Sequence, residues 1–403
     1  MKLCFCAGLM LFSTLLSADL RFQPLTLRTG SDAAQPSVAV DPRFGFVVTW
    51  QERGDSVHKL LFALLRADGQ EIRRGRIASG QDWFVNSADF PNLVVLDNGD
   101  WLTFWLQKSA PDTYAYDVRA VRSRDAGASW DAPITIHRDR TATEHGFVSI
   151  APAGGSAARL VWLDGRRMAN KNSAHGAADE QMTLRTATLT RSGVLRDEQE
   201  LDELSCSCCQ TDVAQGATGT LFAYRGRTLS EVRDISSVLH NGKRFLAPKV
   251  VSADGWKIAG CPVNGPALAA QGNRFAVLWP TMHEQQLSIR IAVGDGMQFG
   301  AAMVVAASAD ELGKVDLASW GEHGFLATRV QQSSGGARLV VDQLDAAGKR
   351  LSSATVATKV GGFPRIARSG AVALLIWTHA GDPKTGSQLG ALLITAPGRT
   401  TEL

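Results

Sequence analysis

The stretch Ser123-Arg124-Asp125-Ala126-Gly127-Ala128-Ser129-Trp130 determines how the rest of the chain is interpreted. It lies between two runs of alternating apolar residues, 116–121 and 133–136, so the sequence predicts a β-hairpin with this stretch as its loop. The Asp125 carboxylate can accept backbone N–H groups within the turn, and Gly127 can adopt the positive φ that a Cβ disfavours. Trp130 can fold back as an apolar plug against a neighbouring sheet.

This S-x-D-x-G-x-x-W pattern resembles the Asp-box, or BNR repeat, of sialidase-like β-propellers of the neuraminidase superfamily. The resemblance implies a propeller related to exported bacterial exo-alpha-sialidases. It also implies that Ser123, Asp125, Gly127 and Trp130 are structural residues of a turn. Because the pattern covers a single turn, it implies a fold rather than an activity.

Composition supports an all-β chain. The 403 residues include 39 glycines and only short apolar runs, and no long stretch has the 3.6-residue period of a helix. The 42 Lys and Arg residues nearly balance the 39 Asp and Glu residues, which gives a formal net charge of +3. This balance predicts neither a nucleic-acid partner nor a basic patch for a membrane surface.

Residues 1–18 have the pattern of a secretory signal peptide. Met1-Lys2 is a short basic start, residues 3–16 are uncharged and mostly apolar, and Ser17-Ala18 are small. We expect an exported mature chain, 19–403, that forms a single propeller domain in the periplasm or outside the cell. Cys4 and Cys6 would be removed with the signal peptide. No other stretch is long enough for a membrane span.

An inner-strand pattern recurs along the chain. Each copy has Pro or a small residue, a short apolar strand, a turn that usually contains Gly, and a second apolar strand that usually ends in an aromatic residue. Successive copies end roughly 50 to 60 residues apart, as expected for four-stranded propeller blades. The end positions are Trp50, Trp105, Trp162, Tyr224, Trp279, Thr328 and Trp377.

These copies favour seven blades. Six blades remain the alternative, because the copy that ends at Thr328 lacks its aromatic residue and six is the usual number in the family that the chain resembles. Only one further strand follows Trp377. We therefore expect residues 20–27 to supply the missing strand of the last blade and to close the ring.

Two cysteine-bearing segments precede neighbouring inner strands. Cys206, Cys208 and Cys209 precede the fourth inner strand, and Cys261 precedes the fifth. Cys206 and Cys261 each lie five residues before equivalent positions of the repeat, Thr211 and Pro266, so both loops should meet at one mouth of the central channel. All four cysteines of the mature chain are predicted to converge there.

The chemistry of this cysteine site has two interpretations. An even number of cysteines in an exported chain predicts two disulfides. Thiolates in a C-x-C-C segment with a fourth cysteine also suit copper(I) or zinc, with Met282 and His283 as further ligands on the same face. His145 is an additional candidate, while the isolated His137 is given no role.

Charged loop residues suggest a ligand site around the cysteines. The candidates are Arg225, Arg233, Asp234, Arg365 and Asp212. Arginine forks bind carboxylates, which would suit a glycan that contains a sugar acid or another small anionic ligand. The alternative is that these residues form ordinary surface ion pairs.

The resemblance to sialidases also implies a catalytic set, which this sequence lacks in part. That set includes an Arg at the first inner strand and a Tyr–Glu nucleophile pair late in the chain. Here the first strand reads Ala34-Gln35-Pro36-Ser37, and no Tyr follows Tyr224. We assign no catalytic residue and leave enzymatic activity open. The expected function is glycan or small-ligand binding, with metal binding and an atypical sialidase or glycoside hydrolase, using carboxylates such as Asp212, Asp234 or Asp316, as alternatives.

Overall fold

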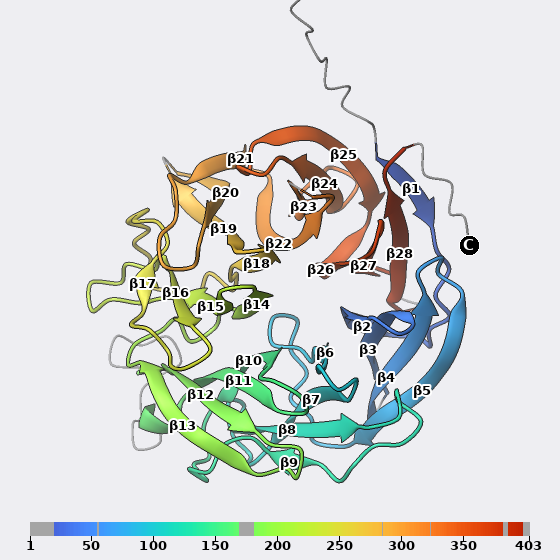
Figure 1. The fold of residues 1–403 in the computed structure, drawn as a ribbon, viewed down its shortest axis with the longest axis vertical. Helices are drawn as coiled ribbons and strands as arrows, with labels where there is room; N and C mark the ends of the chain where they lie inside the picture. Colours follow the sequence, from blue (N-terminus) through green and yellow to red (C-terminus); the bar gives the residue numbers. More distant parts are fainter. Residues whose placement is uncertain are drawn as a thin grey trace, which may run out of the picture.

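The computed structural model describes residues 20–54, 56–168, 181–283, 285–322, 324–381 and 386–397. Seven four-stranded antiparallel sheets surround a central axis as the blades of a β-propeller (Figure 1). The predicted all-β fold is confirmed, and the choice between six and seven blades is settled at seven. The predicted signal peptide, residues 1–18, lies outside the described residues.

The blades follow one another along the chain, and the first strand of blades 1 to 6 lies nearest the axis (Figure 1). Blades 1 to 3 contain β2 (Ala33–Asp41), β3 (Gly45–Arg53), β4 (His58–Arg66) and β5 (Glu71–Gly80); β6 (Leu93–Val95), β7 (Trp101–Lys108), β8 (Tyr116–Ser123) and β9 (Ile134–Thr135); and β10 (His145–Pro152), β11 (Ala158–Asp164), β12 (Thr183–Leu189) and β13 (Leu195–Asp202). A short 3-10 helix, η1 (Arg166–Met168), follows β11.

Blades 4 to 6 repeat this order. They contain β14 (Asp212–Gly216), β15 (Gly219–Arg225), β16 (Ile235–His240) and β17 (Lys249–Val250); β18 (Ala267–Gln271), β19 (Arg274–His283), β20 (Gln286–Gly294) and β21 (Met303–Ala307); and β22 (Glu311–Trp320), β23 (Gly324–Gln331), β24 (Arg338–Leu344) and β25 (Arg350–Thr358).

Blade 7 joins the two ends of the chain. It contains β26 (Val360–Ser369), β27 (Val372–His379) and β28 (Gln388–Thr395), and its outer strand is β1 (Arg21–Pro24). β1 pairs antiparallel with β28 (Figure 1). Arg21 lies opposite Thr395 in this pairing. The predicted closure by the N-terminal strand is therefore confirmed, and it pairs an edge that would otherwise be open.

The hydrophobic core is divided among the contacts between neighbouring blades. Phe62 of blade 1, for example, lies edge-on against Trp101 of blade 2, with ring centroids 5.5 Å apart. Alternation along each strand sends apolar side chains to both faces of a sheet, and each face packs on the next blade. The result is a rigid ring that positions the loops on its two faces.

Buried carboxylates fix the inner strands relative to one another. Asp212 of blade 4 accepts the backbone N–H of Leu268 in blade 5 at 2.6 Å, and Asp316 of blade 6 accepts that of Ile366 in blade 7 at 2.7 Å. Asp89, just before β6, accepts the N–H of Phe147 in β10 at 2.8 Å. These bonds satisfy strand donors that face the neighbouring blade.

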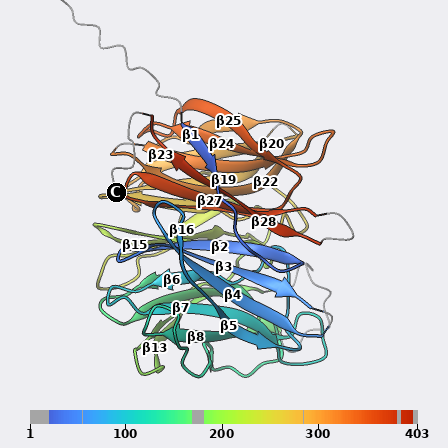
Figure 2. The same ribbon diagram turned by 90° about the vertical axis from the view of Figure 1, so that its right-hand side faces the viewer.

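Strand alternation assigns each loop to one face of the ring, and Figure 2 shows the strands running between the two faces. We call the face with the loops that lead into the inner strands the inner-loop face. The turn between β8 and β9 lies on the opposite face. In that turn Ser129 N donates to Asp125 Oδ1 at 2.8 Å, Gly127 has a φ of 84°, and the Trp130 ring packs 6.1 Å from that of Phe62.

Candidate functional site

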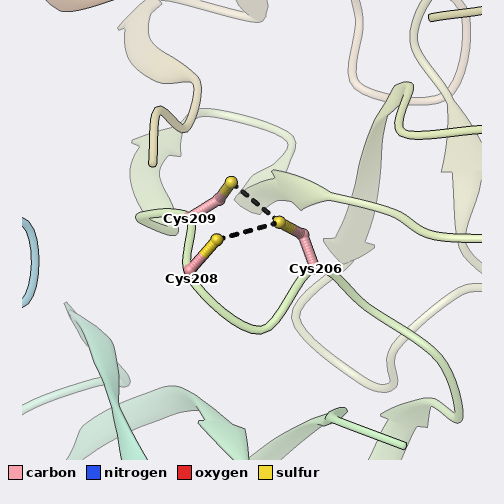
Figure 3. A group of neighbouring side chains, drawn as sticks. All are labelled: Cys206, Cys208 and Cys209. Atoms are coloured by element: carbon pink, nitrogen blue, oxygen red, sulfur yellow. Dashed lines mark hydrogen bonds between the residues drawn. The ribbon is translucent and has the colours of Figure 1, made fainter. Parts of the chain in front are cut away.

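The cysteine-bearing segments before β14 and β18 meet on the inner-loop face. The sulfur atoms of Cys206, Cys208 and Cys209 point toward one another (Figure 3). Cys206 Sγ lies 2.8 Å from Cys209 Sγ and 3.8 Å from Cys208 Sγ, and Cys208 also hydrogen-bonds to Cys261. We call these four residues the thiol cluster. The cluster forms because its two loops occupy equivalent positions in neighbouring blades.

Three of the four cysteines of the thiol cluster are buried. Cys206, Cys208 and Cys209 have exposed fractions of 1%, 7% and 1%, whereas Cys261 is exposed. The backbone N–H of Cys206 donates to the carbonyl of Arg225 at 2.9 Å, which ties the segment to the end of β15. Three buried sulfurs with a fourth at the surface form a preorganised site with an access side.

Arg233 supplies a positive charge to the thiol cluster. Its Nη1 donates to Cys206 Sγ at 3.3 Å, while its Nη2 donates to Glu231 Oε2 at 2.7 Å. Glu231 also accepts from Arg227 Nη2 at 2.7 Å. Arg233 is 1% exposed, so its charge acts on the sulfur with little screening by solvent.

The protonation of the cluster is unequal. Burial on its own raises the pKa of Cys206, but hydrogen bonds from Cys208 and Cys209 and the charge of Arg233 outweigh it and hold that pKa well below its usual value. Hydrogen bonding with Cys206 raises the pKa of Cys208, and burial raises that of Cys209. Cys206 is therefore the cysteine of the cluster that ionises most readily, and its sulfur lies within hydrogen-bonding distance of two thiols and of Arg233.

The Arg225 side chain donates hydrogen bonds to backbone carbonyls of three neighbouring segments. Its Nε donates to the carbonyl of Asn264 at 3.0 Å, its Nη1 to that of Arg233 at 2.7 Å, and its Nη2 to that of Pro280 at 2.8 Å. Its guanidinium also lies 4.7 Å from the ring centroid of Trp256. Arg225 therefore buttresses the loop before β18 and adds a charge that lowers the pKa of Cys209, against the larger effect of burial.

Other predicted ligand-binding residues are occupied by contacts within the chain. Asp234 accepts the N–H groups of Gly255 and Trp256, at 3.1 and 3.2 Å. Asp212 accepts the N–H of Leu268 across the blade boundary, and burial raises its pKa to about 6. The structure does not gather these groups with Arg233 into one anion clamp within the part that it describes.

Arg365 lies near the channel axis rather than at the thiol cluster. Its guanidinium is 5.8 Å from the ring centroid of Phe90, and its Nε is 3.6 Å from Asp316 Oδ2. Lys314 lies 5.8 Å from the ring centroid of Phe363, which is itself 5.9 Å from Phe90. Two cations and two aromatic rings thus gather at the inner strands, apart from the cysteines.

The remaining predictions for this site are the two further metal ligands, Met282 and His283, and the disulfides. Met282 lies in β19 and is 38% exposed, and no described hydrogen bond joins it to the thiol cluster. His283 ends β19, and its side chain lies outside the described part of the structure. None of Cys206, Cys208, Cys209 and Cys261 is joined in a disulfide. The predicted disulfides are thus not found among the residues that the structure describes.

The structure also reveals clusters that the sequence analysis did not predict. Tyr116 Oη contacts both Glu144 Oε1 at 2.7 Å and Asp89 Oδ2 at 3.2 Å, and burial raises the pKa of Asp89 to about 7. His137 and His145 stack on each other beside this group. The only signal in the sequence was the density of His and Asp in residues 137–145, which alone does not specify a site.

The spacing of the thiol cluster suits a metal ion. Two sulfurs that each lie about 2.3 Å from zinc at a tetrahedral angle are about 3.8 Å apart. Cys206 and Cys208 have this separation, and the ligand atoms of all three buried cysteines lie within 4.8 Å of one another. Cys206 and Cys209 lie 2.8 Å apart and would have to separate by about 1 Å to bind the same ion. Arg225 and Arg233 would offset the negative charge of a metal ion bound by several thiolates.

Comparisons with solved structures support the fold. The chain is similar to a protein of unknown function from Dyadobacter fermentans, with a TM-score of 0.53 and 12% identity over 94% of this chain and 99% of that one. It is also similar to the polysaccharide lyase Uly1, with a TM-score of 0.54 and 9% identity over 92% and 91% of the chains. A neuraminidase-like protein from A/bat/Guatemala/164/2009 matches with a TM-score of 0.49 and 8% identity over 93% of each chain.

Comparisons of the sequence find no match, neither to a family model nor to a curated protein. At such low identities the structural matches concern the fold alone. In the described part of the chain, no helix is long and apolar enough to cross a membrane. By its fold, the chain is a seven-bladed β-propeller, and its similarity to the polysaccharide lyase Uly1 concerns this fold alone.

Proposed function

We propose that this protein binds a thiophilic metal ion, copper(I) or zinc, in the thiol cluster on its inner-loop face. The observation that carries the proposal is the convergence of three buried sulfurs, with a fourth thiol hydrogen-bonded to Cys208. Soft sulfur ligands select these ions, and sulfurs that are already gathered in one place lower the cost of ordering the ligands. The predicted signal peptide supports export, where a bound metal ion would protect the thiols from oxidation.

The test is a parallel count of thiols and metal. The mature protein is recovered after export without reductant, its thiols are titrated under denaturing conditions, and its copper and zinc are measured by mass spectrometry. We expect four thiols and at least one metal ion per chain. We also expect Cys206→Ser to bind one metal ion fewer than the wild type, while Met282→Leu, which removes an exposed sulfur outside the cluster, binds as many as the wild type.

The disulfide interpretation predicts a different result. It requires no detectable thiol before reduction, with Cys206 joined to Cys209 and Cys208 joined to Cys261, the pairs that lie in contact. Two such disulfides, together with no binding of copper(I) or zinc after reduction, would contradict the proposed function.

A second candidate is an anionic glycan or small ligand near the channel axis. Arg365 and Lys314 each lie against an aromatic ring, Phe90 and Phe363, and the Arg365 side chain is 23% exposed. Arginine binds carboxylates, and aromatic rings offer apolar faces to sugars. Calorimetric titration with sialic acid and uronic acid oligosaccharides tests this candidate. Binding that Arg365→Ala weakens and Arg196→Ala, an exposed control in β13, preserves would support it; absence of binding would contradict it.

A further inference from the structure

A second cluster of potential metal ligands lies on the inner-loop face, between blades 2 and 3. The rings of His137 and His145 stack face to face, with centroids 3.7 Å apart and planes inclined by 1°. Both side chains are buried, with exposed fractions of 2% and 0%. The segment between β9 and β10 carries them, and this segment has the same repeat position as the one that carries Cys206 in the next blade.

Asp139 holds both rings in place. Its Oδ1 lies 3.0 Å from His137 Nδ1, and its Oδ2 lies 3.0 Å from His145 Nε2. The other nitrogen of His145 lies 3.1 Å from the carbonyl oxygen of Thr143. Because a carboxylate accepts hydrogen bonds, the ring nitrogen that faces Asp139 is the donor in each of these two contacts.

This contact sets the tautomer of His137. Because Nδ1 donates to Asp139, a neutral ring carries its lone pair on Nε2. That Nε2 atom is buried and has no hydrogen-bond partner, and the Asp117 Oδ1 atom lies 3.6 Å from it. Two electron-pair donors thus face each other at a distance too long for a good hydrogen bond.

We propose that Asp117 and His137 bind a divalent transition-metal ion of the zinc class between them. Zinc lies about 2.0–2.1 Å from imidazole nitrogen and about 2.0–2.2 Å from carboxylate oxygen, which places two such ligand atoms about 3.4–3.6 Å apart at tetrahedral to trigonal angles. The observed separation of 3.6 Å falls within that range. Asp139 is the outer carboxylate that typically orients a metal-binding histidine.

The site opens onto a pocket. Asp117 and His137 both line a cavity of about 450 Å³, and Thr135, Arg138 and Arg140 also contribute to its wall. Two protein ligands leave coordination positions for water or for an exogenous ligand. The two arginines favour an anionic ligand, such as a carboxylate or a phosphate, in those positions.

This site is independent of the proposed function, because its ligands are nitrogen and oxygen atoms and it shares no residue with the thiol cluster. Cobalt(II) separates the two sites by its spectrum, since thiolate ligands produce intense charge-transfer absorption and nitrogen or oxygen ligands do not. The mature protein, with its thiol cluster first filled with copper(I), is dialysed against cobalt(II) alone. The bound cobalt is then counted and its spectrum is recorded.

We expect one cobalt ion per chain with no thiolate charge-transfer band. His137→Gln and Asp117→Asn should each weaken binding by at least about tenfold, and Asp139→Asn by about 10- to 100-fold. The matched control His240→Gln changes another buried histidine, 7% exposed, in blade 4 and should bind cobalt normally. Cys206→Ser should also retain this cobalt ion, so a failure of the thiol cluster leaves the test intact.

The proposal would be overturned if the wild-type protein bound no cobalt outside the thiol cluster. It would also be overturned if His137→Gln and Asp117→Asn bound cobalt as the wild type does. Circular dichroism shows whether each variant is folded. Asp117 is the decisive position should His137→Gln fail to fold, because its side chain is 28% exposed and Asn has nearly the same shape.

Discussion

The Asp-box turn and the thiol cluster are both short polar segments, but they differ in how their hydrogen bonds are used. In the turn, the Asp125 carboxylate accepts bonds from Ser129 N, Ser129 Oγ and Ser123 Oγ, all within the motif. In the cluster, Cys206 is bonded to two other cysteines and to Arg233. The Asp125 carboxylate finds its hydrogen-bond donors within the turn, whereas the cluster brings together soft sulfur atoms that can bind a metal ion.

The two regions also lower a pKa by different means. Hydrogen bonds from Ser129 lower the pKa of Asp125 to about 2 at an exposed position. The pKa of Cys206 is lowered in spite of burial, by its neighbouring thiols and Arg233. A buried charge must be stabilised by neighbouring charges or hydrogen bonds, and buried groups with a shifted pKa are frequently functional. The motif that identifies the fold is therefore not the region where chemistry should be sought.

Removing a buried thiol should have the largest effect. Cys209→Ser is expected to weaken zinc or copper(I) binding by at least about 100-fold, because one of four thiolates supplies roughly 3 kcal/mol of a typical 10–16 kcal/mol. The exposed Cys261→Ser should lose only about tenfold, since water can replace its sulfur. Competition with a chelator of known affinity measures both. Equal losses, or none, would show that burial does not distinguish the ligands.

The charge beside the cluster should have the next largest effect. Arg233→Met removes a cation that helps to lower the pKa of Cys206, so that pKa should rise, and once it exceeds the working pH the thiolate fraction falls by about tenfold for each further unit. The rate of alkylation of Cys206 in the metal-free protein, followed by peptide mass spectrometry, should fall accordingly. Arg196→Ala is the control for loss of an arginine, and an unchanged rate in Arg233→Met would refute the role of this charge.

The Asp-box should affect stability alone. Asp125→Ala removes the acceptor of three hydrogen bonds in the turn and is expected to lower the free energy of unfolding by roughly 1–2 kcal/mol. Urea unfolding measures this change. Asp131→Ala, which removes an exposed partner of Arg124, should cost less than about 1 kcal/mol. Loss of bound metal in folded Asp125→Ala would contradict the separation of the two regions.

The pH dependence of the turn should be the smallest effect. Because the folded pKa of Asp125 is lowered to about 2 from 3.8, its contribution to stability is fully present above pH 4 and is lost as the pH falls toward 2. The difference in stability between wild type and Asp125→Ala should therefore shrink across that window. Urea midpoints at pH 5, about 3 and about 2 test this expectation, and a constant difference would argue against it.

The repeat explains why much of the fold could be predicted. Regular spacing of inner strands and the single strand left after Trp377 predicted seven blades and closure by β1. The same spacing placed Cys206 and Cys261 in equivalent loops, and these loops do meet. Residues at equivalent positions of the sequence repeat lie at equivalent places in the structure, because every blade has the same strand order.

Side-chain partners across blades could not be predicted in this way. Asp212 and Arg225 were candidates for ligand binding because their residue types suit it, yet they bond to Leu268 and to the carbonyl of Pro280 in the next blade. Those contacts depend on the register between sheets, which no local pattern records. His137 was given no role because its partner Asp117 lies on a strand of the same blade, β8, twenty residues earlier in the chain.

X-ray absorption spectroscopy of the metal-loaded protein tests the central claim most directly. The thiol cluster predicts a first shell of three or four sulfur atoms at about 2.3 Å from copper or zinc. That shell should be lost from folded Cys206→Ser and retained in Asp125→Ala. A first shell of nitrogen and oxygen alone, or no metal bound to protein with four reduced thiols, would contradict the account.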